Sequence, residues 1–384
     1  MDNIVNIVFI TDKTYILPTK IALRSLVKHI SDEYMYKIYV IFDGEEDISF
    51  QKLMGEDIPS NVTIEQIYPN INLNFISQEH LYVSKSALLK FELPNIFSYL
   101  DKILYIDGDV LIKGDLGELY EIDLEDYYLA AVKDMGTYDG DHLEKLGISD
   151  YFNSGVMLLN LKKIREDNKI PQLYEYKKHQ TDTRFMDQDA FNVVLGQNVK
   201  YLSCKYNFIP TFLSDFSENQ IASFYGVDKS ELKSCYIYHL AGHEKPWNDP
   251  TVHLFSEWFA YLEYGMDMAI CLENYFRKSI HQQYCDNQDR IADVTYCKSL
   301  IEQEKVQQQS DNNARMLDVD YLKELNKILN DREAALESKE ATLETKLFEM
   351  SQHINETNNQ IRYIHERRFG FRLKKLIKRV FGRK

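Results

Sequence analysis

The chain of 384 residues lacks several features that would place it in a specialised class. It has no run of about 18 consecutive apolar residues, so we expect no membrane-spanning helix. The N-terminus, Met1-Asp2-Asn3, carries no basic segment, and no signal peptide is evident. The five cysteines are scattered without a CxxC spacing. This pattern predicts reduced thiols in a cytosolic protein rather than a disulfide framework.

Positive charge is also scarce, because 45 Lys and Arg stand against 60 Asp and Glu, which gives a net charge of −15. Such an acidic chain is not expected to have nucleic acid as its main partner. Hydrophobic residues make up 44% and aromatic residues 13%. The chain is therefore not largely disordered, and it is long enough to form a sizeable core and more than one domain.

Short β-rich segments alternate with helical ones over the first 262 residues. The predicted strands cover residues 6–11, 37–42, 62–68, 102–106, 110–112 and 128–132. One predicted helix is opened by Pro18, and another covers residues 84–97 with Pro94 interrupting it. Strands that alternate with helices predict an α/β protein whose mostly parallel sheet is covered by helices on both faces.

The most informative segment is Asp107-Gly108-Asp109, which joins two apolar strands. On an extended backbone, side chains two residues apart face the same way. Two hard oxygen donors held there suit a divalent cation that binds a phosphate-bearing ligand. Asp12 and Asp134 also follow strands, and ligands of such sheets bind beyond the C-terminal strand ends. Four acids at these ends indicate one site; the alternative is a surface turn with solvated acids.

Beyond residue 262 the composition changes, and residues 263–314 are interpreted as a helical connector. Residues 315–366 are predicted to form a long helix, because Gly and Pro are absent from 315 to 369. Apolar residues repeat there every seven positions, as in a coiled coil that would form a homodimer; they are Leu322, Leu329, Leu336, Leu343 and Met350. The partner seam is poor, since Leu325 is followed by Arg332, Lys339 and Lys346. A single solvated helix, or one folded onto the body, is the alternative.

The last segment, residues 367–384, holds nine basic residues and no acid, interleaved with large apolar residues. As a helix it would separate an apolar face from a cationic one. This pattern is typical of an interfacial helix attracted to anionic lipid. We therefore expect a cytoplasmic protein that is peripheral at the inner face of the cell membrane. A solvated tail or an RNA-binding arm is the alternative.

Several separated segments resemble glycosyltransferase family 8, a family of retaining transferases with a GT-A fold. They are residues 6–15, 102–112, 151–162, 186–192, 206–210 and 239–247. The resemblance extends over about residues 4–262 and includes the bacterial lipopolysaccharide and lipooligosaccharide galactosyl- and glucosyltransferases. It implies a GT-A domain over residues 1–262, with a Rossmann-like mixed sheet, followed by the helical C-terminal extension.

The resemblance also implies a site, residue by residue. The metal ligands would be Asp107, Asp109 and His239, and a nitrogen ligand favours Mn²⁺, with Mg²⁺ as a substitute. Gln188, below the anomeric carbon, and Asp187 would be the catalytic residues. The expected contacts to the UDP-sugar come from Thr11, Asp12, Tyr15, Lys90, Gly108, Asp134, Asn153, Ser154, Gly242 and Lys245.

Two of these positions carry further expectations. Lys90 stands where the family usually has Arg, so a bidentate contact is in doubt. Asn153 is expected on a turn before Ser154-Gly155, where asparagine is also a common turn former.

The function implied is transfer of galactose or glucose from a UDP-sugar to a hydroxyl of a glycan or lipid-linked glycan, with retention of configuration. A front-face reaction is preferred over a double displacement, because an amide oxygen is a feeble nucleophile. One alternative is a sugar nucleotidyltransferase, although no Gly-rich phosphate loop follows the first strand. Another is a non-catalytic coiled-coil scaffold that binds UDP-sugar.

Overall fold

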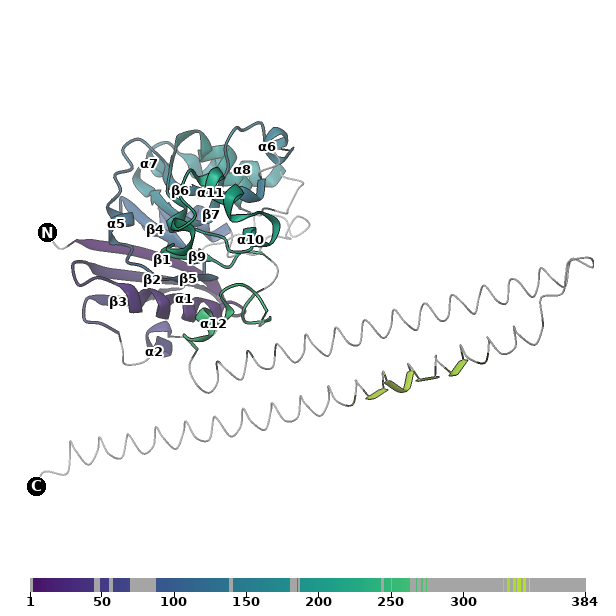
Figure 1. Ribbon diagram of the computed structural model, residues 1–384. Coiled ribbons are helices and arrows are strands. Elements are labelled where there is room, and N and C mark those ends of the chain that lie inside the picture. Colours follow the sequence, from purple (N-terminus) through teal and green to yellow (C-terminus); the bar gives the residue numbers. More distant parts are fainter. Residues whose placement is uncertain are drawn as a thin grey trace, which may run out of the picture. The chain divides into compact units, whose positions relative to one another are not determined.

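The computed structural model describes residues 3–262 except 45–48, 55–57, 70–87, 138–140, 180–184, 186, 243–244 and 250, and isolated residues between 267 and 345. The chain divides into two compact units. One comprises Met1–Lys245 and Val252–Tyr261, and the other comprises Pro246–Thr251 and Leu262–Lys384. The strands and helices labelled in Figure 1 belong to the first unit.

A seven-stranded sheet forms the centre of the first unit, in the order β3-β2-β1-β4-β7-β6-β8 (Figure 1). Its strands are β1 (Ile4–Asp12), β2 (Met35–Asp43), β3 (Val62–Ile67), β4 (Lys102–Ile106), β6 (Leu129–Lys133), β7 (Phe152–Asn160) and β8 (Val199–Tyr201). β7 is antiparallel to its neighbours β4 and β6, and the other pairs are parallel. The chain first builds outward from β1 to β3 and then returns to place β4 on the other side of β1. In α/β sheets, ligands bind at such a switch point.

The sheet separates two hydrophobic cores because side chains alternate along each strand. In β1, Ile7 and Phe9 belong to one core, while Val8 and Ile10 belong to the other. Helix α1 (Ile16–His29) packs into the first core, and α7 (Leu161–Glu166), α8 (Lys169–His179) and α9 (Gln188–Leu195) pack into the second. The predicted mostly parallel sheet with helices on both faces is therefore confirmed.

Two predicted helices differ in detail from the observed ones. Helix α1 begins at Ile16, two residues before Pro18. The helix predicted over 84–97 is seen from Leu88 onward: Leu88 and Leu89 are helical, followed by a 3₁₀ turn, η2 (Lys90–Glu92), and a short helix, α4 (Leu93–Ile96). Pro94 lies in the first turn of α4. Backbone N–H groups in a first turn make no hydrogen bond within the helix, so proline, which lacks this N–H, is well tolerated there. Pro94 thus starts this helix rather than interrupting it; residues 84–87 lie outside the described residues.

A second, two-stranded sheet pairs β5 (Val110–Ile112) with β9 (Ile237–His239) in antiparallel orientation. Val110 lies opposite His239, and the backbone N–H of Leu240 donates to the carbonyl oxygen of Asp109 at 2.8 Å. This pairing brings a histidine from the end of the unit to the Asp107-Gly108-Asp109 segment.

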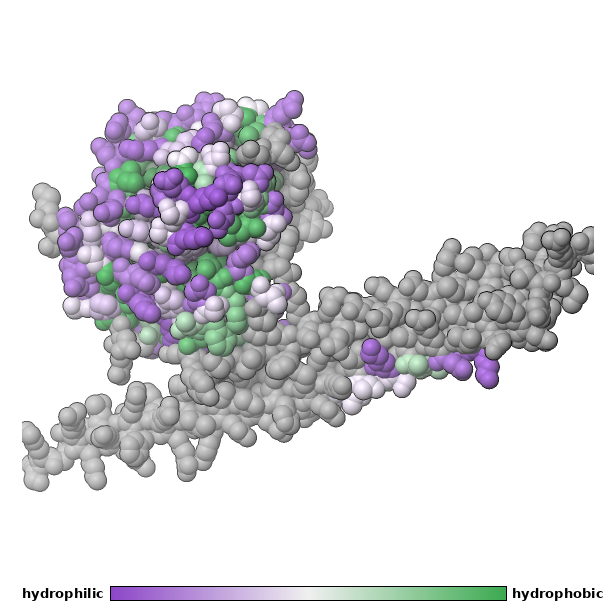
Figure 2. Space-filling model, viewed as in Figure 1, coloured by the Kyte–Doolittle hydropathy of each residue, from purple (hydrophilic) through white to green (hydrophobic). Residues whose placement is uncertain are grey.

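Shorter elements complete the described part of the chain. They are α2 (Phe50–Met54), α5 (Gly117–Glu121), η3 (Met135–Thr137), α6 (Asp141–Leu146), η4 (Gly196–Asn198), η5 (Cys204–Tyr206), α10 (Phe212–Asp215), α11 (Glu218–Tyr225), η6 (Glu231–Lys233) and α12 (Phe255–Phe259). On the face shown in Figure 2, hydrophilic residues dominate and hydrophobic ones are scattered among them.

The C-terminal predictions fall mostly outside the described residues. The residues that are described between Lys327 and Thr345 are helical and exposed. The heptad leucines and the basic segment 367–384 lie outside the described residues. Among the described helices, none combines the length and the apolar character needed to cross a bilayer.

Candidate metal and donor-sugar site

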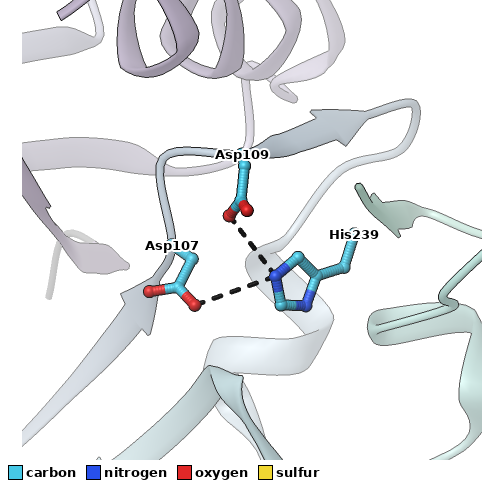
Figure 3. Close-up of side chains that lie close together, drawn as sticks. All are labelled: Asp107, Asp109 and His239. Carbon is cyan, nitrogen blue, oxygen red and sulfur yellow. Dashed lines mark ion pairs between the residues drawn. The ribbon is translucent and has the colours of Figure 1, made fainter. Parts of the chain in front are cut away.

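Three side chains converge beyond the C-terminal end of β4. Asp107 follows β4, Asp109 precedes β5 and His239 ends β9. The imidazole Nε2 of His239 lies 3.3 Å from Oδ1 of Asp109 and 3.8 Å from Oδ2 of Asp107 (Figure 3). One donor atom from each residue lies within 4.8 Å of the others. Two carboxylate oxygens and one imidazole nitrogen form a donor set that suits a divalent transition metal.

Two lysines accompany the acidic pair. Lys90 Nζ lies 3.2 Å from Oδ1 of Asp107, which also accepts a hydrogen bond from the Tyr105 hydroxyl. Lys245 Nζ lies 2.6 Å from Oδ2 of Asp109 and donates to the carbonyl oxygen of Leu240 at 2.7 Å. The cations keep the buried Asp109 and the half-buried Asp107 from standing as uncompensated charges.

The two acids respond differently to this environment. Burial raises the pKa of Asp107; Lys90 opposes the increase, and the negative charge of Asp109 adds to it. Burial also acts to raise the pKa of Asp109, but Lys245 and the His239 ring outweigh it and hold that pKa below its usual range. Asp109 is thus the more firmly ionised of the two ligands.

Room for the side chains of His239 and Asp107 depends on Gly155 in β7. A Cβ atom at this position would lie 2.2 Å from Cε1 of His239 and 2.9 Å from Oδ2 of Asp107. Both distances are too short for a real Cβ contact, so any other residue would displace one of these two candidate metal ligands. The donor set and the glycine together fit a metal centre.

A second group of polar side chains lies beside this centre and includes the residues expected to line the donor sugar. Oδ2 of Asp134 accepts hydrogen bonds from Nδ2 of Asn153 at 3.1 Å and from Nε2 of Gln188 at 2.9 Å. Oε1 of Gln188 accepts the backbone N–H of Ser154 at 2.9 Å. Because both ends of the Gln188 amide are engaged, its orientation is fixed.

Lys90 joins the two groups. Its Nζ lies 2.9 Å from Oδ2 of Asp187, in addition to its contact with Asp107. Asp187 immediately precedes α9, but its side chain makes no capping hydrogen bond to that helix. It instead accepts from Ser154 Oγ at 3.2 Å and pairs with Lys90. Burial acts to lower the pKa of Lys90, but the charges of Asp107 and Asp187 raise it above its ordinary value.

The prediction that Asn153 lies on a turn is wrong. Asn153 lies within β7, which runs from Phe152 to Asn160. The strand begins before the Asn-Ser-Gly segment because Phe152 pairs with Lys133 of β6, past an irregularity in the β6–β7 register. Asn153 therefore reaches the site from a rigid sheet.

The nucleotide end of the predicted site lies at the C-terminal end of β1. Oδ1 of Asp12 accepts the backbone N–H groups of Thr14 at 2.7 Å and of Tyr15 at 3.2 Å, which shapes the turn into α1. Burial, followed by the charges of Asp109, Asp107 and Asp12, raises the pKa of the Tyr15 phenol. The acids of the candidate metal site therefore act electrostatically on Tyr15. The hydrogen bonds described for Asp12, by contrast, stay within residues 12–15.

Gly108 and Gly242 occupy positions that suit glycine for different reasons. A Cβ on Gly108 would lie 2.4 Å from Oγ1 of Thr19, which in turn donates to Oγ1 of Thr11 at 3.0 Å. Gly242 has a φ of +108°, in the left-handed region that other residues rarely adopt. It lies in the segment that leads from β9 to Lys245.

The sequence interpretation missed three contributors. Tyr105 lies two residues before Asp107 on the same strand, so the two-residue periodicity could have identified it. Gly155 and Asn207 belong to segments that carried the family resemblance, but no local signal assigned them a role. Asn207 is buried and donates from Nδ2 to Oδ1 of Asn153 at 2.9 Å.

Several known proteins are similar to this chain in sequence. General stress protein A of Bacillus subtilis is 26% identical over 272 residues, which cover 68% of this chain and 94% of that protein. The lipopolysaccharide 1,2-glucosyltransferase of Escherichia coli K12 is 26% identical over 258 residues, covering 65% and 74%. Glycosyltransferase GlyF of Streptococcus pneumoniae is 26% identical over 268 residues, and the match spans only 61% of its length.

Solved structures share the fold. The galactosyltransferase LgtC in complex with donor and acceptor sugar analogues matches 67% of this chain and 95% of its own, with a TM-score of 0.54 at 24% identity. The bifunctional glycosyltransferase WbbM matches 70% of this chain and 51% of its own, with a TM-score of 0.60 at 23% identity. The sequence profile of glycosyl transferase family 8 matches residues 6–251. Since this match spans well over half of the chain, the protein belongs to glycosyl transferase family 8.

Proposed function

We propose that this protein is a retaining hexosyltransferase. It would transfer galactose or glucose from a UDP-sugar to a hydroxyl of a glycan or lipid-linked glycan, with Mn²⁺ as its cofactor and Mg²⁺ as a substitute. The observation that carries the proposal is the meeting of Asp107, Asp109 and His239 within 4.8 Å, beside a lysine and a group of buried polar residues. A metal and a cation next to hydroxyl-binding groups suit a sugar diphosphate.

The phosphate end of the donor would lie at the metal ligands. Asp107, Asp109 and His239 would hold the cation, which supplies Lewis-acid stabilisation for the departing diphosphate. Lys245 already lies against Asp109, so its ammonium can also reach a phosphate bound at the same centre. Gly242 lets the backbone approach the phosphates closely, and Tyr15 and Asp12 would hold the uracil.

The sugar would lie against Asp134, Asn153 and Gln188. Carboxylate and amide groups read sugar hydroxyls through paired hydrogen bonds, and these three are already ordered by one another. Asp187 and Ser154 border the same place. Recognition by pre-ordered groups costs less entropy on binding than recognition by mobile ones.

A front-face reaction fits the role of Gln188. Its Oε1 accepts a backbone N–H, so it is not presented as a free nucleophile. In the front-face reaction the bond from the anomeric carbon to the UDP oxygen breaks, and the bond to the acceptor oxygen forms on the same face. A UDP phosphate oxygen takes the acceptor proton. The Gln188 amide would stabilise the positive charge at the anomeric carbon through its dipole.

Two observations support a proposal for the acceptor class, namely the name of one relative and the composition of residues 367–384. A relative from Escherichia coli is a lipopolysaccharide glucosyltransferase. Residues 367–384 combine nine basic residues with large apolar ones, which suits attachment to an anionic membrane. We therefore propose a lipid-linked glycan acceptor at the inner face of the cell membrane, with residues 315–366 providing a coiled coil for a homodimer.

The first experiment is release of UDP from UDP-galactose and from UDP-glucose, with Mn²⁺ and a glycan acceptor. Asp109→Ala should abolish release, while Glu175→Ala, an exposed acid on α8, should match the wild type. The anomeric configuration of the product, read by NMR, should be that of the donor. Equal release by the wild type and Asp109→Ala would favour a scaffold, and an inverted product would exclude the retaining reaction.

A further inference from the structure

The ring nitrogen of His239 that points away from the acids faces two amide oxygens. Its Nδ1 lies 3.1 Å from Oδ1 of Asn153 and 3.2 Å from Oδ1 of Asn207. All three side chains are buried. An oxygen can only accept a hydrogen bond from an imidazole nitrogen that carries a proton, so the identity of these amide atoms decides whether Nδ1 is protonated.

The neighbouring hydrogen bonds fix both amides. Oδ1 of Asn153 accepts the backbone N–H of Gly155 at 3.0 Å, and its Nδ2 donates to Oδ2 of Asp134 at 3.1 Å. Nδ2 of Asn207 donates to Oδ1 of Asn153 at 2.9 Å. Turning either amide around would set donor against donor or acceptor against acceptor. The atoms that face Nδ1 are therefore oxygens.

We propose that Asn207 is a positioning residue that, together with Asn153, holds His239 in the Nδ1–H tautomer, so that Nε2 directs its lone pair at the cation. The role rests on the proposed metal site, since only a cation requires Nε2 to be the free nitrogen. Metal-binding histidines commonly donate their other N–H to such a partner, which fixes both the tautomer and the ring orientation.

Asn207 contributes more than Asn153 to fixing the tautomer of His239. Oδ1 of Asn153 is shared by the N–H groups of Gly155 and Asn207 as well as by His239, yet it has only two lone pairs. Oδ1 of Asn207 faces the ring with no other described hydrogen bond. The backbone also keeps Asn207 in register, because Phe208 N–H donates to Ile237 at 2.9 Å and His239 N–H donates to Phe208 at 2.7 Å.

The test measures Mn²⁺ binding by electron paramagnetic resonance, without substrate or turnover. Asn207→Leu, which removes the acceptor at similar volume, should weaken Mn²⁺ binding by roughly 10–100-fold, the loss typical of such partners. Asn207→Asp keeps an oxygen opposite Nδ1 but sets its second oxygen against Oδ1 of Asn153, so it should recover binding in part. Asn6→Leu, at a buried asparagine that bonds to Tyr120 in the core, is the control and should bind as the wild type does. Wild-type binding by Asn207→Leu, or equally weak binding by both Asn207 variants, would refute the role.

A second measurement reads the tautomer directly and does not depend on metal. In ¹⁵N-histidine NMR spectra recorded where the ring is neutral, His239 of the wild type should carry its proton on Nδ1. Asn207→Asp should retain that signature, and Asn207→Leu should lose it in part. A proton found on Nε2 in the wild type would overturn the inference. If the wild type binds no Mn²⁺, the proposed function fails, but this spectrum still tests whether Asn207 sets the tautomer of His239.

Discussion

Replacing Gly155 with alanine should remove the metal site while leaving the fold in place. The backbone of Gly155 lies outside the left-handed region, so alanine is compatible with the strand. The new methyl group would lie 2.2 Å from Cε1 and 2.7 Å from Nδ1 of His239, and 2.9 Å from Oδ2 of Asp107. The effect is therefore purely steric and acts on two candidate metal ligands.

The size of the effect follows from contact distances. Carbon atoms settle about 3.5–4.0 Å apart, so the imidazole must retreat by roughly 1.3 Å or the strand must shift by a similar amount. Metal–ligand distances tolerate only about 0.2 Å. We expect Mn²⁺ affinity to fall at least about 100-fold, because loss of a mere supporting contact already costs 10–100-fold. Overpacking should also lower the free energy of unfolding by about 1–3 kcal/mol.

The assay compares Mn²⁺ titration and thermal unfolding in Gly155→Ala and in Gly196→Ala. Gly196 follows α9, has a φ of −60°, and nothing lies within 4 Å of a Cβ added there. Gly196→Ala should therefore bind Mn²⁺ and unfold as the wild type does. A folded Gly155→Ala protein that binds Mn²⁺ with wild-type affinity would show that His239 and Asp107 do not hold the cation as the structure indicates.

Three further perturbations test other parts of the proposal. Asp109→Asn keeps the shape but removes the charge, so kcat/KM for UDP release should fall by about 100-fold or more; a wild-type rate would contradict a ligand role. Burial raises the pKa of Asp107, and Lys90 opposes that increase. A carboxyl group must be ionised to bind a cation. Lys90→Met should therefore move the loss of Mn²⁺ binding at acid pH to a higher pH, while Lys90→Arg should leave it in place. Identical pH profiles of Mn²⁺ binding in the wild type and Lys90→Met would exclude an effect of Lys90 on Asp107. Removal of residues 367–384 should abolish sedimentation with anionic vesicles, since each basic residue adds about 1 kcal/mol of attraction, and should spare UDP-sugar hydrolysis. Retained sedimentation would place membrane attachment elsewhere.

Much of the fold was predictable because it depends on local patterns. Segments such as residues 6–11 and 37–42 are apolar and β-rich, and they form β1 and β2 with bounds wider by one or two residues. The Asp107-Gly108-Asp109 segment was recognisable because its flanking strands are apolar on both sides. Pro94 was expected to interrupt the helix over 84–97 and instead lies in the first turn of α4, since a proline signals a helix boundary without saying on which side the helix lies.

The site depended on the tertiary structure to a much larger degree. The sequence alone supplied the acidic pair, and the family resemblance supplied His239. The placement of Nε2 between two carboxylates is set by the β5–β9 register, which pairs Val110 with His239. Asn153 lies on a strand and not on a turn because β7 pairs with β6 beyond a register shift.

The sequence by itself therefore determined the strands β1 to β6, the acidic pair and, through the resemblance, the family, whereas β7, β8 and β9 were not predicted. The tertiary structure decided that Lys90 bridges Asp107 and Asp187, that Gly155 leaves room for two candidate metal ligands, and that two amide oxygens face the far side of His239. Local patterns record which face of an element is apolar. Contacts between side chains on strands far apart in the chain depend on register and packing, which no single segment encodes.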